Sequence, residues 1–144
     1  MIVPDANLLL YAYDSESPFW DRARRWWTEC LNGTTPIGLT HPVVSAFLRI
    51  STMVRVFRNP LSLEEAAAEV AAWHSRRVVV TLLPDRDHHE AVIALLRSIG
   101  SAGGNLVSDA QIAALAMAHG ATVHSADHDF RRFPGLRCRF PLEP

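Results

Sequence analysis

Apolar and polar positions along the chain predict short strands that alternate with longer helices. Apolar runs of strand length lie at residues 1–5, 35–39, 78–83, 121–124 and 137–140. Helical spacing of apolar residues marks segments 7–13, 18–32, 42–54, 62–74 and 92–99, and a long Ala/Leu-rich segment that ends at His119. This alternation is typical of a mainly parallel sheet with helices on both faces. We therefore predict an α/β fold, with three α/β/α layers and about five strands.

Polar residues beside these segments predict where the helices begin. Ser17 precedes a proline, which is the pattern of an N-cap followed by proline in the first turn. Ser62 with Glu65 has the pattern of a capping box, and Ser108 with Gln111 fits the same pattern. The run 78–83 has no polar break, as in a strand that is buried on both faces. No linker or internal repeat interrupts the order, so we predict a single domain over residues 1–144.

The composition of the chain is that of a globular protein without a membrane-spanning segment. The chain has 144 residues, of which 49% are hydrophobic and 20% are charged, as in a globular domain with one core. No apolar run approaches the length of a membrane span, and the N-terminus lacks the pattern of a signal peptide. The two cysteines form neither a disulfide framework nor a metal motif. We therefore expect a cytoplasmic protein that does not bind membranes.

Four aspartates are predicted to meet at one edge of the sheet. Asp5 follows the first strand, and Asp127 and Asp129 follow the 121–124 strand. Asp109 lies near the start of the helix that precedes this strand, and such a crossover helix begins at the carboxyl end of the sheet. Ligands of open parallel sheets bind at that end. The acids therefore mark a candidate site.

Carboxylates that crowd one edge repel each other and raise each other's pKa, and a divalent cation relieves this repulsion. Oxygen ligands alone favour Mg²⁺ or Mn²⁺ over zinc. Asn7 could add an amide ligand or orient the first acid, and Asn105 would share a helix face with the acid on the last helix. Structural roles stay open, because Asp5 could cap a helix and Asp127 and Asp129 could be turn residues.

Several segments together resemble one known family. They are residues 4–9, the stretch 46–52, Ser108-Asp109-Ala110 with the apolar run 112–116, residues 119–122, the loop 125–130, and the segment 133–136. In this combination they resemble the PIN domain of the VapC toxins, over nearly the whole chain. The last third carries the most specific part of the resemblance.

The resemblance implies a Mg²⁺- or Mn²⁺-dependent endoribonuclease, the toxin of a type II toxin–antitoxin pair, with a PIN-like α/β/α fold. Asp5, Asp109 and Asp127 match the family's metal-binding acids, and Asp129 matches an additional catalytic acid. Asn7 matches the polar position beside the first acid. Two further implications are that a metal-activated water attacks the phosphate and that the products carry a 5′-phosphate and a 3′-hydroxyl.

Further positions complete the comparison with the family. Ser125 matches its Ser/Thr before the third acid. At position 46 the family usually has a glutamate, whereas this chain has Ala46. The site therefore has one negative charge fewer, which leaves open whether it holds one ion or two. Asn105 or Asp129 could compensate for the missing glutamate.

The resemblance also implies partners. Structured tRNA or rRNA loops are the expected substrates, since sequence-specific RNA recognition usually targets exposed loops. All 14 basic residues are arginine, and Arg25, Arg49 and Arg131 are candidates for contact with the RNA backbone. A VapB-type antitoxin whose tail covers the acidic edge, and a homodimer, are expected as well.

Two other functions stay open. A phosphatase of the haloacid dehalogenase type also has an aspartate at a strand end, but it needs an aspartate where this chain has Asn7, and it needs a lysine, which this chain lacks. The second alternative is a weakened PIN domain that acts mainly by binding RNA or an antitoxin. Ala46 is the feature that favours it.

Overall fold

A computed structural model describes residues 1–144 and contains one parallel sheet of five strands in the order β3-β2-β1-β4-β5. The strands are β1 (Ile2–Pro4), β2 (Ile37–Thr40), β3 (Val79–Leu82), β4 (Thr122–His124) and β5 (Arg137–Arg139). Every neighbouring pair is parallel. The predicted number and direction of the strands are confirmed.

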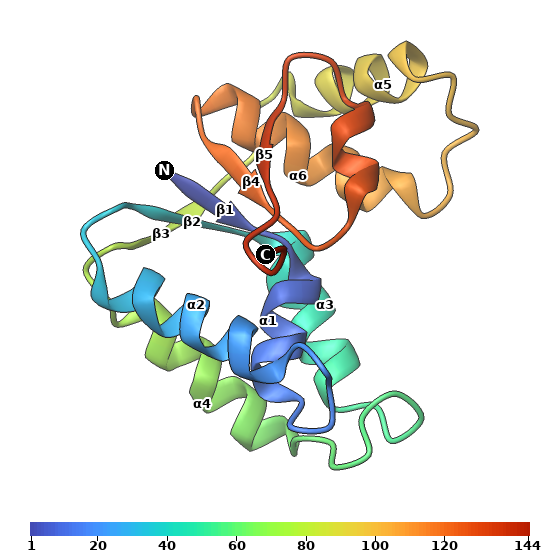
Figure 1. Cartoon of the computed structure of the whole chain (residues 1–144). Helices are drawn as coiled ribbons and strands as arrows, with labels where there is room; N and C mark the ends of the chain where they lie inside the picture. Colours follow the sequence, from blue (N-terminus) through green and yellow to red (C-terminus); the bar gives the residue numbers. More distant parts are fainter.

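Six α-helices cover the two faces of the sheet. They are α1 (Ala6–Tyr13), α2 (Trp20–Asn32), α3 (His41–Ser51), α4 (Leu63–His74), α5 (His88–Ser98) and α6 (Leu106–Ala118). Helices α1 to α4 lie on one side of the sheet and α5 and α6 on the other, which confirms the three layers (Figure 1). None of these helices has the length and hydropathy that crossing a membrane requires.

The order of the strands reverses beside β1. The chain runs outward from β1 to β2 and β3, and then returns to place β4 on the other side of β1. Because crossovers between parallel strands are right-handed, this return puts α5 and α6 on the opposite face. Pro4 pairs in register with His124, and Asp5 N donates a hydrogen bond to the His124 carbonyl at 2.8 Å. The segments that follow β1 and β4 therefore start side by side, at the position where such sheets bind ligands.

Aromatic side chains fill the core between the sheet and α1 to α4. Phe47 and Trp73 are fully buried, with ring centroids 4.6 Å apart in an edge-to-face arrangement. Trp27 meets Trp73 edge-to-face at 5.6 Å. Such pairs stabilise a core beyond the area that they bury. This packing holds α3 in place, and α3 forms one wall of the site.

Three local predictions can be compared with the observed boundaries. The capping box of α4 is confirmed, since Glu65 N donates to Ser62 Oγ and Ser62 N donates to Glu65 Oε1. Ser17 does not cap α2, because its Oγ accepts from the amide of Phe19 and the helix begins only at Trp20. The alternative that Ser108 and Gln111 form a capping box does not hold, because α6 begins at Leu106 and Ser108 lies in its first turn.

The prediction of a strand buried on both faces at 78–83 is wrong as well. The observed strand β3 is an edge strand, and Val80 is 42% exposed. Leu83, just after the strand, is 64% exposed. An apolar run indicates a strand, but it does not indicate whether that strand lies at the edge of the sheet. Edge position depends on the order of the strands.

Candidate active site

Asp5 is held at the junction between β1 and α1. It is 7% exposed and is the N-cap of α1, where its Oδ1 accepts a hydrogen bond from Ala6 N at 2.7 Å. Its Oδ2 accepts a hydrogen bond from Ser125 Oγ at 2.6 Å. Asp5 therefore caps a helix and also lies at the carboxyl edge of the sheet, so the structural role and the site position coincide in one residue.

Ser125 connects the ends of β1 and β4. It is fully buried, and besides donating to Asp5 it accepts from Asp127 N at 2.8 Å and from Asn7 Nδ2 at 3.3 Å. Asn7 Oδ1 in turn accepts from Ala126 N at 3.3 Å. We call Asp5, Asn7, Ser125 and Asp127 the strand-end network. Its hydrogen bonds fix the orientation of the first acid and the course of the loop after β4.

Asp127 and Asp129 lie on an exposed turn after β4. Asp127 Oδ1 accepts from Asp129 N at 2.8 Å and so caps the 3₁₀ helix His128–Arg132. Asp129 Oδ1 lies 3.9 Å from Arg132 Nη1. Asp127 and Asp129 are therefore both turn residues, which was the structural alternative that the sequence left open. The nearby Arg132 balances part of the Asp129 charge.

The C-terminal segment packs against the same turn. The Phe140 ring stacks on His128 with centroids 4.4 Å apart and planes 9° apart, and Arg131 Cζ lies 4.4 Å from the Phe140 centroid. His128 Nε2 is 2.6 Å from Glu143 Oε1. Arg131, a predicted RNA contact, therefore has an aromatic partner within the chain. No local sequence pattern signals this arrangement, because the two segments meet only in the folded chain.

Asp109 lies in the first turn of α6 and is partly buried. Burial, and then the charges of Asp5, Asp127 and Asp129, raise the pKa of the Asp109 carboxyl to about 7. No hydrogen bond lowers it. Burial also raises the pKa of Asp5, although the hydrogen bonds from Ser125 and Ala6 N oppose the shift. The four predicted acids are therefore close enough to act on each other electrostatically.

A cleft of about 340 Å³ lies between α1, α3 and α6. Asp5 and Asp109 line it, and we call it the acid cleft. Ala46 lines its α3 wall, at the position where the resemblance predicts a glutamate, and Arg49 on the next turn of α3 contributes a positive charge. Gln111 on α6 also lines the cleft, and sequence reasoning considered it only as a cap.

The remaining predicted residues do not line the acid cleft. Asn105 is exposed just before α6 and makes no capping hydrogen bond, and Arg25 is exposed on α2. Among acidic, histidine and cysteine side chains, no three are arranged closely enough to hold one metal ion as they stand. The structure thus brings Asp5 and Asp109 into one cleft, with Asp127 beside Asp5 through Ser125.

Comparison with known proteins identifies the family to which the chain belongs. The PIN domain family matches residues 2–136. Ribonuclease VapC33 of Mycobacterium tuberculosis is 42% identical over 142 residues, which cover 99% of each chain. Relatives of known structure share the fold at lower identity: VapBC2 from Rickettsia felis, bound to a promoter DNA fragment, has a TM-score of 0.66 at 20% identity and covers 96% of this chain and 98% of its own.

Mycobacterium tuberculosis VapC20, a toxin that cleaves the sarcin-ricin loop, also has a TM-score of 0.66, at 18% identity over 95% of this chain and 99% of its own. The resemblance read from the sequence is confirmed by these matches. The chain therefore belongs to the PIN domain family and, within it, to the VapC ribonucleases.

Proposed function

We propose that this VapC-family endoribonuclease cleaves RNA at the acid cleft with a divalent cation held by Asp5, Asp109 and Asp127. The observation that supports the proposal most directly is the pKa of about 7 at Asp109 in the acid cleft, which burial and then three other carboxylates raise and no hydrogen bond lowers. Such a group is costly in the ionised form unless a positive charge lies beside it. A bound cation would supply that charge.

The residues present fit a hard cation. The candidate ligands are carboxylate oxygens, and the acid cleft has no histidine or cysteine in its lining. Oxygen donors favour Mg²⁺ or Mn²⁺. When bound, the ion would stabilise negative charge on a phosphate and lower the pKa of a water molecule.

The chain's own residues supply orientation and charge. Ser125 and the amide of Ala6 hold the two oxygens of Asp5, so this carboxylate keeps one orientation. Asn7 donates to the same serine hydroxyl and keeps it in place. Arg49 offers the cleft a guanidinium, which is suited to a phosphate of the RNA backbone. Arg25 and Arg131 stay candidates for more distant contacts.

Asp129 and Asn105 have a smaller role in this proposal. Asp129 raises the pKa of Asp109 and could orient a water molecule, but its contact with Arg132 reduces the charge that it offers. Asn105 is exposed at the start of α6 and could supply an amide oxygen from there.

A second candidate function is that of a weakened domain that acts by binding RNA or an antitoxin. Two observations favour it: Ala46 replaces a carboxylate in the cleft, and the acids do not converge on one point as they stand. The two candidates differ in whether folded protein cleaves RNA when metal is supplied.

The family suggests the RNA substrate and the protein partners of this chain. The VapC20 relative cleaves the sarcin-ricin loop, and the Rickettsia felis relative is a VapBC complex on promoter DNA. By analogy we propose that this toxin acts on a structured rRNA or tRNA loop and pairs with a VapB-type antitoxin. An apolar hollow between α5 and α6, lined among others by Leu95, Ala114 and Met117, supports a homodimer interface.

The test is cleavage of total tRNA and rRNA by purified, antitoxin-free protein in Mg²⁺, in Mn²⁺ and in a chelator, with Asp109→Ala alongside. Discrete fragments that need metal and that the variant does not produce would support the nuclease. If folded protein gives no fragments with either metal, the binding function is favoured. The next variant to assay is then Ala46→Glu, which restores the carboxylate.

A further inference from the structure

The acid cleft continues around the N-terminal half of α3 into two further hollows. The first, the middle hollow, measures about 410 Å³ and shares Pro42, Ser45 and Gln111 with the acid cleft. The second, the edge pocket, measures about 220 Å³ and shares His41 and Ser45 with the middle hollow. Since Ser45 lines all three, the hollows are neighbours, and we call this row of hollows from the acids to the sheet edge at β3 the groove.

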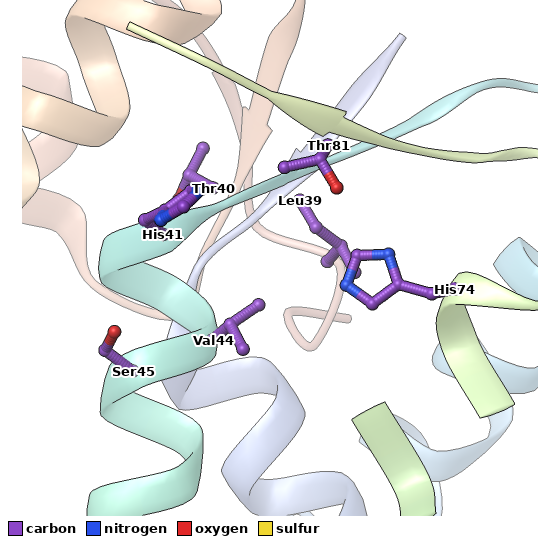
Figure 2. A pocket seen from close by; sticks show the side chains of 7 residues that line it. All are labelled: Leu39, Thr40, His41, Val44, Ser45, His74 and Thr81. Atoms are coloured by element: carbon purple, nitrogen blue, oxygen red, sulfur yellow. The ribbon is translucent and has the colours of Figure 1, made fainter. Parts of the chain in front are cut away.

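Figure 2 shows how the edge pocket is built. The imidazole of His74, at the end of α4, and the hydroxyl of Thr81 on β3 point into the space between the sheet and α3. Val44 of α3 lies opposite, and His41 and Ser45 complete the lining. The pocket therefore presents two imidazole rings, two exposed hydroxyls and an apolar wall.

The chemistry of the groove changes with distance from the acids. Neither the middle hollow nor the edge pocket has a carboxylate in its lining. Histidines take the place of the acids: His41, His74, His88 and His89. A surface without carboxylates, rich in imidazole and hydroxyl groups, suits a polyanionic strand and its bases better than it suits a cation.

We propose that the edge pocket binds one unstacked base of the RNA substrate, with His74 against the face of the base and the Thr81 hydroxyl at its edge. The proposal rests on the proposed function, because the groove leads from the cleavage site. Proteins that recognise RNA loops stack splayed bases on aromatic side chains, histidine among them, and hydrogen-bond their edges. At about 30 Å³ per water molecule, the pocket volume corresponds to several waters or one flat ring system.

The test uses full-length, antitoxin-free protein and the variants His74→Ala and Thr81→Val. Thr35→Val, in the exposed loop before β2, is the matched control for Thr81→Val. Three quantities are measured: Kd for fluorescent tRNA and rRNA fragments in a chelator, and kcat and KM for metal-dependent cleavage. Thermal unfolding shows that each variant folds.

We expect His74→Ala and Thr81→Val to raise Kd and KM roughly tenfold, the loss typical of one base contact, and to leave kcat unchanged. Unchanged Kd and KM in both variants would overturn the base pocket while leaving the nuclease intact. If the wild-type protein neither binds nor cleaves RNA, the proposed function fails as well.

Discussion

The two walls of the acid cleft differ in how they hold their carboxylates. On the strand side, Asp5 has hydrogen bonds to both oxygens, and Ser125 and Asn7 connect it to the loop after β4. On the helix side, Asp109 has a pKa that burial and three acids raise to about 7, and Ala46 faces it from α3. The strand side is rigid without metal, whereas the helix side lacks a positive partner. If a cation binds in the acid cleft as proposed, we expect its largest effect on the helix side, where Asp109 lacks a positive partner.

Loss of either acid should abolish cleavage, but with different effects on folding. Asp5→Ala removes an N-cap and leaves the Ser125 hydroxyl without its acceptor, so we expect a loss of about 1 kcal/mol in the free energy of unfolding. Asp109→Asn removes a repelled charge, so the metal-free variant should gain on the order of 1 kcal/mol at pH 8, allowing for screening of a half-exposed group.

Denaturant unfolding without metal measures the stability of Asp5→Ala and Asp109→Asn. RNA cleavage with metal measures their activity. We expect cleavage to fall at least about a hundredfold in each, since a ligand is lost. Equal stability losses in the two variants would contradict the distinction between the two walls.

Ser125→Ala tests the strand-end network without removing an acid. The serine orients Asp5 and accepts from the Asp127 amide, and loss of such an outer residue typically costs about 10- to 100-fold in metal affinity or activity. Mn²⁺ affinity and cleavage should both fall in this range. Ser98→Ala, on the exposed end of α5, is the control. Wild-type Mn²⁺ affinity in Ser125→Ala would show that the network does not position a ligand.

Ala46→Glu makes the helix side more acidic. The added carboxylate should lower the stability of the metal-free protein and raise Mn²⁺ affinity and cleavage several-fold, because more repulsion is relieved when the ion binds. Ala46→Gln has the same shape without the charge and should change neither. If the glutamate variant cleaves no better than the glutamine variant, the missing charge does not limit this enzyme.

The pH dependence of stability gives the smallest effect. An unfolded aspartate loses its proton near pH 4, whereas Asp109 in the folded chain keeps it to about pH 7. Between these values the folded state binds more protons, so this group makes the metal-free protein less stable as pH rises from 4 to 7, with no further change above. Thermal unfolding across this range should show the trend in wild type and a weaker one in Asp109→Asn. An equal slope in both would exclude Asp109 as its source.

Much of the fold was predictable because its signals are local. Apolar periodicity indicated the strands and helices, and their alternation indicated a parallel sheet with helices on both faces. The position of β3 at the edge was not predictable, because exposure of Val80 depends on the order of strands. The start of α6 was also missed, since Ser108 and Gln111 mimic a cap inside a helix that begins at Leu106.

The sequence predicted which acids lie at one edge of the sheet, because the order of strands and helices determines their placement. Strand ends and a crossover helix were enough to expect Asp5, Asp109 and Asp127 at one edge, and their roles as metal ligands stay predictions. The contacts of Phe140 with His128 and Arg131 depend on how the C-terminal segment packs, which no sequence pattern indicated. The edge pocket was likewise missed, because His74 and Thr81 come from elements that meet only through packing against α3.

The most direct test of a cation site at the helix wall is calorimetric titration of antitoxin-free protein with Mn²⁺ at pH 7, in two buffers of different ionisation enthalpy, with Asp109→Asn alongside. We predict saturable binding with release of about half a proton per ion, because a group with a pKa of about 7 is half protonated at this pH. The variant should bind far more weakly and without this proton release. Absence of binding, or identical binding by both proteins, would contradict a cation site built on Asp109.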